Sequence, residues 1–197
     1  LIKLAEASSA SLTTRNEIEM YYLLDSTLDL INAPQLKDYI ELKVEYNNTN
    51  LQSLGEVQYH AFFFGSVDQY NPFYDINTKE LLSGSSIAAD DEIMLDNNDV
   101  MFSVFNSGTE DLTLNTNGGN TIISAQNTDA QTTAFSWMAT DEPVEGLANF
   151  STNKTASRLT MIGTAIHSYQ GAVLPVELTD IKVRADEEGW AHVTWTT

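Results

Sequence analysis

The 197-residue chain has no cysteine and few basic residues. The lack of cysteine excludes disulfides, thiolate catalysis, cysteine-based zinc sites and iron–sulfur clusters. Nine Lys and Arg residues stand against 28 Asp and Glu residues, which gives a formal net charge of -19. Nucleic acids and anionic membranes both attract basic surfaces, so neither is an expected partner. No apolar run approaches the length of a membrane-spanning helix, so no membrane insertion is expected.

Short segments in which apolar and polar residues alternate dominate what is present. This period of two is typical of half-buried strands, and Asn- and Gly-rich spacers separate the segments. One spacer, residues 117–120, is expected to close a hairpin between Leu114 and Ile122, because Gly and Asn tolerate positive φ. The pattern predicts an all-β fold of immunoglobulin-like β-sandwich modules plus a C-terminal β-hairpin. The strand phase predicts buried side chains at Ile40, Leu42, Val44, Phe102, Val104, Leu112 and Trp137.

Three segments follow from the spacing of strand and turn signals. We expect a β-rich N-terminal module at 1–84, a second module at 85–173, and a linker with a partial hairpin at 174–197. The Gly-, Ser- and Ala-rich residues 83–89 are the expected internal boundary. Only residues 77–82 favour a short helical turn.

The sequence from Met101 to Leu114, MFSVFNSGTEDLTL, predicts a strand, a tight turn and a returning strand. It resembles the F-x-V/I-x-N-x-G-T-x-x-L-x-L core of choice-of-anchor-type immunoglobulin-like domains. The later stretch from Leu159 to Gly163 loosely matches the family's last strand. The resemblance implies an immunoglobulin-like β-sandwich for the second module.

A second stretch begins LPVELTD at Leu174 and ends VTWTT at Thr197. It looks like the L-P-V-E-L … W-T-T opening of fibronectin-III-like modules in secreted Bacteroidota proteins, which are typically exported by type IX secretion. In that family the module continues past W-T-T, so we expect only its first two strands here. The resemblance implies an extracellular, cell-surface protein. The first 85 or so residues resemble no family.

Sequence motifs for catalysis are not evident. His60, His167 and His192 lie at no metal-binding spacing from one another. Nucleophile-elbow, P-loop and dinucleotide-binding patterns are missing. We therefore expect a protein that is not an enzyme.

One acidic stretch is the best candidate for a metal site, although a solvated acidic turn explains it as well. Carboxylate and amide oxygens in a short loop suit Ca²⁺, the one cofactor considered. The candidate ligands are Asp90, Asp91, Glu92, Asp96 and Asp99.

An aromatic segment follows residues 62–64 and places Tyr70, Phe73 and Tyr74 among Asp and Asn residues. Such side chains could stack on sugars or form a subunit contact. The alternative is that the segment folds back over the core. These residues are the candidates for glycan binding or self-association.

The last two predicted strands share one apolar face, to which Leu178, Ile181, Val183, Val193 and Trp195 contribute. A lone two-stranded hairpin is marginal in water, and its edges can pair with another chain. We expect it to dock on another copy, giving a homo-oligomer. The expected function is that of a non-catalytic, extracellular structural or adhesive protein, such as a self-assembling filament or sheath subunit. The alternative is a carbohydrate- or calcium-binding accessory module of a larger secreted enzyme.

Overall fold

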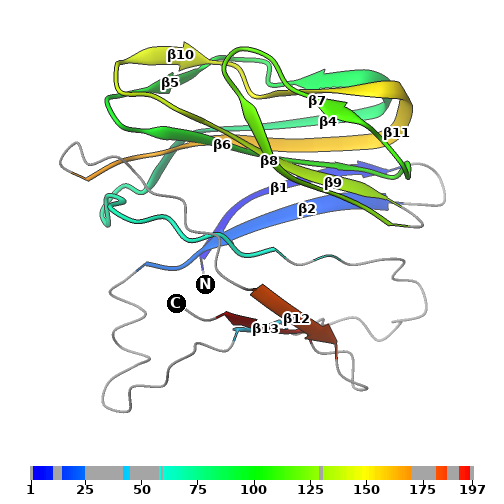
Figure 1. Ribbon diagram of the computed structural model, residues 1–197, viewed down its shortest axis with the longest axis horizontal. Helices are drawn as coiled ribbons and strands as arrows, with labels where there is room; N and C mark the ends of the chain where they lie inside the picture. Colours follow the sequence, from blue (N-terminus) through cyan, green and yellow to red (C-terminus); the bar gives the residue numbers. More distant parts are fainter. Residues whose placement is uncertain are drawn as a thin grey trace. The chain divides into compact units, whose positions relative to one another are not determined.

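The computed structural model describes residues 2–10, 15–24, 42–44, 58, 60–128, 131–169, 181–185 and 191–195. Within these ranges the chain forms strands and turns and contains no helix, which confirms the all-β fold class (Figure 1). The strands are β1 (Ile2–Ala10), β2 (Arg15–Tyr22), β3 (Leu42–Val44), β4 (Phe73–Ala88), β5 (Ile93–Leu95), β6 (Val100–Ser107), β7 (Leu114–Asn115), β8 (Thr121–Asn127), β9 (Thr132–Ala139), β10 (Val144–Gly146), β11 (Asn149–Ile166), β12 (Ile181–Ala185) and β13 (Ala191–Trp195).

The chain divides into two compact units. The first comprises Leu1–Leu23 and Ser66–Leu174, and the second comprises Leu24–Gly65 and Pro175–Thr197. The predicted boundary at residues 84–85 lies inside β4, whereas the boundary at 173–174 lies next to the division between the units.

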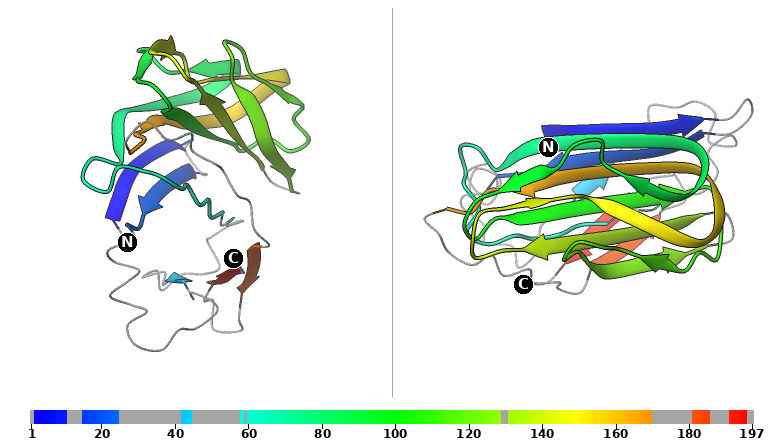
Figure 2. Two further views of the ribbon diagram at one scale, coloured as in Figure 1. Left: turned by 60° about the vertical axis from the view of Figure 1, so that its left-hand side comes forward. Right: turned by 90° about the horizontal axis from the view of Figure 1, so that it is seen from above.

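An antiparallel sheet with the order β4-β11-β6-β9-β8 organises the first unit. The two longest strands, β4 and β11, lie side by side along it (Figure 2). β11 pairs with β7 near its start and with β6 over its second half. The register of β11 with β4 shifts between Ser151 and Ala156. On its other side, the partner of β11 changes from β7 near this shift to β6 after it. This long strand therefore links the short strand β7 to the rest of the six-stranded sheet.

The hydrophobic core lies between the central sheet and the layer that contains β5 and β10. Phe105 from β6 and Phe150 from β11 are almost completely buried, with ring centroids 5.3 Å apart. Ile93 and Leu95 from β5 close the other side. Because side chains alternate along a strand, Phe102 and Val104 lie on the opposite face of β6 from Phe105, and they too are buried.

The β1–β2 hairpin covers part of this opposite face. β1 contacts β4 and β11, and β2 contacts β11 and β6. Ile18 of β2 is buried, and the Asn16 side-chain amide donates to the Arg158 carbonyl at 2.9 Å. The alternation in β2 follows the expected period of two, because Glu17 and Glu19 are exposed. The first unit thus has a layer on each face of its central sheet.

A close approach between layers depends on Gly163 in β11. A methyl group at this position would lie 2.6 Å from Ala148 Cβ and 3.3 Å from Ile93 Cδ1. Any side chain would therefore push the two layers apart.

The second unit contains a three-stranded antiparallel sheet with the order β12-β13-β3. The predicted C-terminal hairpin is present, with Ile181 opposite Trp195 and Val183 opposite Val193. It does not stand alone, however, because β13 also pairs with β3 of the same chain. A third strand from its own chain therefore supplies one of the partners that a two-stranded hairpin needs.

Two local expectations were wrong. Residues 117–120 connect β7 and β8, which pair with β11 and β9 rather than with each other. Gly118 and Gly119 do adopt positive φ, so the turn chemistry is confirmed although the hairpin is not. Residues 77–82 belong to β4 instead of a helical turn, because pairing with β11 overrides the weak local preference.

The predicted core is confirmed at Phe102, Val104 and Leu112, which are buried. Trp137, also predicted to be buried, is only half-buried. The predictions for Ile40, Leu42 and Val44 lie outside the residues whose side chains are described.

Candidate functional site

The main polar cluster of the first unit lies where β4, β6 and β11 come together at their ends. Tyr74 is near the start of β4, Asp99 immediately precedes β6, and His167 and Ser168 follow β11. Asp96 joins them through the turn that leads into β6, in which the Asp99 amide donates to the Asp96 carbonyl at 3.1 Å. We call these five residues the Asp99 junction.

The Asp99 carboxylate is fully buried and accepts from four groups. Oδ1 lies 2.9 Å from the Ser168 amide nitrogen and 3.1 Å from His167 Nδ1. Oδ2 accepts from the Asp96 amide at 2.8 Å and from the Tyr74 hydroxyl. A buried carboxylate is tolerated only when it is well hydrogen-bonded, and Asp99 meets that condition entirely with groups of its own chain.

Tyr74 is held in its hydroxyl form at this junction. Burial raises its pKa, and the hydrogen bond to Asp99 raises it further. The hydroxyl therefore remains a donor across the physiological pH range. The ring also meets the His167 ring edge-on, with centroids 5.5 Å apart. Tyr74 therefore links β4 to the start of β6 through its hydrogen bond to Asp99.

Asp96, Asp99 and His167 present ligand atoms within 4.8 Å of one another, a spacing that can suit a metal ion. Two of the predicted calcium ligands are therefore brought together. A carboxylate offers about four acceptor positions, and protein donors already occupy four on Asp99. Ca²⁺ also needs six to eight oxygen ligands. The hydrogen bonds to Asp99 therefore favour a structural role for this group of residues over metal binding.

The other predicted calcium ligands lie beyond the opposite end of β5. Asp90 forms an ion pair with Lys79, and Asp91 is exposed. Glu92 interacts with Glu145 on β10, and this hydrogen bond and the negative charge of Glu145 raise the Glu92 pKa. None of these three belongs to the Asp96, Asp99 and His167 group.

The predicted aromatic site is divided by the structure. Tyr74 is committed to the Asp99 junction, and Phe73 is half-buried with its ring centroid 4.9 Å from that of Tyr22. Tyr70, in contrast, is 91% exposed. It therefore remains available as a contact residue.

The loop that carries Tyr70 is fixed by its backbone. Asp68 accepts from the amides of Tyr70 and Asn71, and these two hydrogen bonds lower the Asp68 pKa. The Asp68 amide donates to the His167 carbonyl at 2.9 Å, and the His167 amide donates to the Pro72 carbonyl at the same distance. The loop thus presents Tyr70 from a defined turn next to the Asp99 junction.

The predicted assembly residues can be placed only by their backbone. Ile181 and Val183 lie on β12, and Val193 and Trp195 lie on β13. Leu178 lies outside the described residues.

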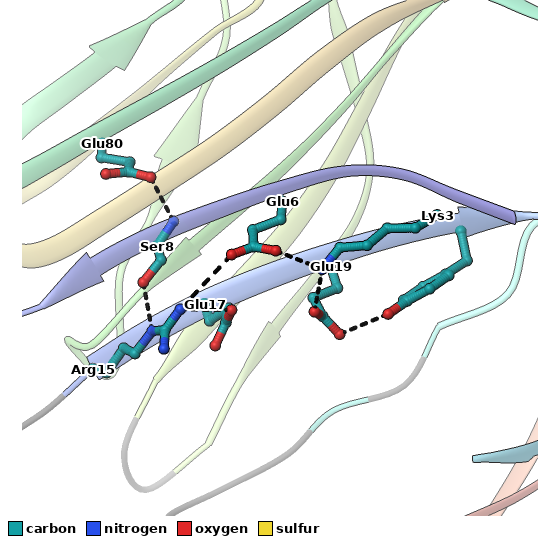
Figure 3. Close-up of polar contacts among 8 residues, drawn as sticks. Lys3, Glu6, Ser8, Arg15, Glu17, Glu19 and Glu80 are labelled. Carbon is teal, nitrogen blue, oxygen red and sulfur yellow. Dashed lines mark hydrogen bonds and ion pairs between the residues drawn. The ribbon is translucent and has the colours of Figure 1, made fainter. Parts of the chain in front are cut away.

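A second polar group covers the outer surface of the β1–β2 hairpin (Figure 3). Lys3 Nζ lies 2.5 Å from Glu6 and 2.6 Å from Glu19, and Arg15 lies 2.8 Å from Glu17. Glu6 and Glu19 face each other across the two strands, so Lys3 neutralises a like-charge pair. The hydrogen bond from Lys3 is the main cause of the lowered Glu19 pKa.

This charge network also attaches the hairpin to β4. The Ser8 amide donates to Glu80 Oε1 at 2.7 Å (Figure 3). The Ser9 hydroxyl donates to the Leu81 carbonyl at 2.9 Å. Sequence reasoning missed the network, although the alternating charges in residues 15–19 were a usable signal. It also missed His167, which lies 68 positions from Asp99 and has no local motif.

The chain has no match among models of known protein families, curated proteins or solved structures. Among the described segments, none is a helix with the length and hydrophobicity needed to cross a membrane.

Proposed function

We propose that the protein is a non-catalytic, extracellular structural or adhesive module that forms homo-oligomers, as a filament or sheath subunit does. The observation that carries the proposal is the Asp99 junction. Its ionisable groups have the composition of a reactive site, yet the Asp99 carboxylate is saturated by donors that join three strand ends. The polar groups of the junction therefore stabilise the fold.

The exposed charges support the same proposal. Lys3 and Arg15 are paired with glutamates on the hairpin, and Lys79 is paired with Asp90. The two sequence resemblances favour an extracellular address and an immunoglobulin-like variant of the sandwich. A net charge of -19 keeps such a surface soluble.

Localisation tests the proposal directly. Antibodies against the full chain should label intact producing cells, or extracellular material around them, without permeabilisation. Labelling that requires permeabilisation would contradict an extracellular structural role. Antibodies against a cytoplasmic protein of the same cells provide the control for membrane integrity.

Carbohydrate binding is the second candidate function, and the exposure of Tyr70 favours it. An aromatic ring that is 91% exposed on a fixed loop beside Asp68 and Asn71 can stack on a sugar while polar neighbours accept from its hydroxyls. For any glycan that the wild-type chain binds on a glycan array, Tyr70→Ala should weaken the binding affinity about tenfold. Tyr21→Ala, at a residue that is 45% exposed, is the matched control. Equal binding by both variants would reject Tyr70 as a sugar platform.

A further inference from the structure

Charged residues are scarce in the part of the sequence that forms β8 and β9. Residues 112–140 contain one charged residue, Asp129, although the whole chain has 28 acidic and nine basic residues. Two copies of a chain with a net charge of -19 repel each other least where they approach through uncharged segments. This part of the first unit is therefore best suited to contact between copies.

β8 is also an edge of the central sheet. It pairs with β9 on one side, and no strand in the described part of the chain pairs with its other side. An edge strand presents backbone donors and acceptors that can pair with another strand. β8 contains neither proline nor a charged residue, two features that commonly protect an edge.

The opposite edge, β4, has such protection. It carries Asp75, Lys79 and Glu80. The β1–β2 hairpin is also attached beside it through the Ser8–Glu80 and Ser9–Leu81 hydrogen bonds. The two edges of one sheet thus differ in both charge and covering, which identifies β8 as the edge open to pairing.

The geometry of β8 leaves a regular docking segment. A register shift between Ile122 and Ser124 disturbs the start of the strand. Residues 124–127 then pair regularly with β9, and Ala125 and Gln126 are exposed. These four residues offer backbone donors and acceptors at the regular strand spacing, to which a second antiparallel strand can pair.

We propose that the regular segment of β8, residues 124–127, pairs antiparallel with the same segment of a second copy about a two-fold axis at Ala125, so that each Ala125 lies opposite its counterpart and one sheet continues across both copies. The inference rests on the proposed homo-oligomeric function and names one contact surface, which joins two copies into a dimer; a filament would need a further contact beyond it. A second copy of the chain is the favoured partner, because two identical uncharged edges can form a closed two-fold contact. A basic partner would instead be drawn to the acidic surfaces elsewhere on the chain.

Site-specific crosslinking tests this contact, and the absence of cysteine makes the result unambiguous. Ala125→Cys places a single thiol on the exposed part of β8, and Thr78→Cys places one on the exposed surface of β4. With a short bis-maleimide, Ala125→Cys should yield at least about tenfold more covalent dimer than Thr78→Cys. The reason is that pairing of β8 holds the two Ala125→Cys thiols at a high effective concentration. Equal yields from the two variants would overturn the proposal.

Sedimentation provides a second readout. The weight-average mass of the wild-type chain should rise from 21.8 kDa towards twice that value as concentration increases through the micromolar range. Ala125→Lys should weaken this association at least about tenfold, because it puts like charges at the pairing edge, whereas Thr78→Lys should not. The two variants change the net charge equally, so their difference isolates the edge.

The possible failures are distinguishable. A wild-type chain that remains at 21.8 kDa up to millimolar concentration would overturn β8 pairing, while extracellular labelling could still support the structural role. A β8-linked dimer found only inside permeabilised cells would reject the extracellular role and leave the pairing intact. If Ala125→Lys unfolds, as judged by circular dichroism, Gln126→Glu tests the same edge at a second exposed residue.

Discussion

The Asp99 Oδ1 atom lies 2.9 Å from the backbone nitrogen of Ser168, two residues after β11 ends. The contact joins the start of β6 to the end of its neighbour in the sheet. His167 and Tyr74 approach the same carboxylate from β11 and β4. One buried side chain thus fixes the ends of three strands, which makes the sheet depend on a single acidic residue.

Replacing Asp99 with Ala should lower the free energy of unfolding by about 3–5 kcal/mol, because the change leaves buried donors without an acceptor. Urea denaturation followed by tryptophan fluorescence measures this loss. Tyr74→Phe removes a single donor and should cost about 1 kcal/mol. Equal costs for the two variants would contradict the central role of the carboxylate.

Gly163→Ala should destabilise the first unit by about 2 kcal/mol, because the added methyl group collides with Ala148 and Ile93 in a packed core. Gly84→Ala is the matched control in the adjacent strand β4. Its added methyl group would meet its nearest atom, the Ser86 carbonyl oxygen, at 3.4 Å. It should be neutral, or stabilising by about 0.5 kcal/mol, because alanine restricts the unfolded chain more than glycine does. Similar thermal shifts for both variants would refute the packing argument.

Lys3→Gln should lower the melting temperature at low ionic strength, because Glu6 and Glu19 then face each other without a shared cation. The difference from wild type should shrink at high salt, which screens exposed charges. The double variant Lys3→Gln/Glu19→Gln should recover part of the loss. A loss that is independent of salt would point to packing by the lysine stem instead.

The sequence was informative wherever local periodicity determines structure. The strand phase predicted the buried Phe102, Val104 and Leu112, and the turn-forming Gly118 and Gly119 do adopt positive φ. The same residues could not reveal that their turn joins β7 and β8 without forming a hairpin, because the choice of partner strand depends on the whole sheet.

The candidate site was less accessible to sequence reasoning. Asp99 was singled out by its acidic neighbours, but its environment is built from Tyr74 and His167, which are 25 and 68 positions away. An acidic loop has the same local sequence whether its carboxylates face solvent or backbone amides. Only the tertiary fold distinguishes exposed Asp91 from fully buried Asp99.

Glu92→Gln should raise the melting temperature at neutral pH, because Glu92 and Glu145 are neighbouring carboxylates that repel when both are ionised. The folded state raises the Glu92 pKa above 4.5, so the pair favours folding when a proton is shared and loses that contribution as pH rises through the raised pKa. The benefit of Glu92→Gln should therefore disappear near pH 3.5, a change that differential scanning calorimetry across this range would detect. Glu110→Gln, which removes the same charge from another exposed position, controls for net charge. Equal stabilisation by both variants at neutral pH would show that the total charge, and not the Glu92–Glu145 pair, is responsible.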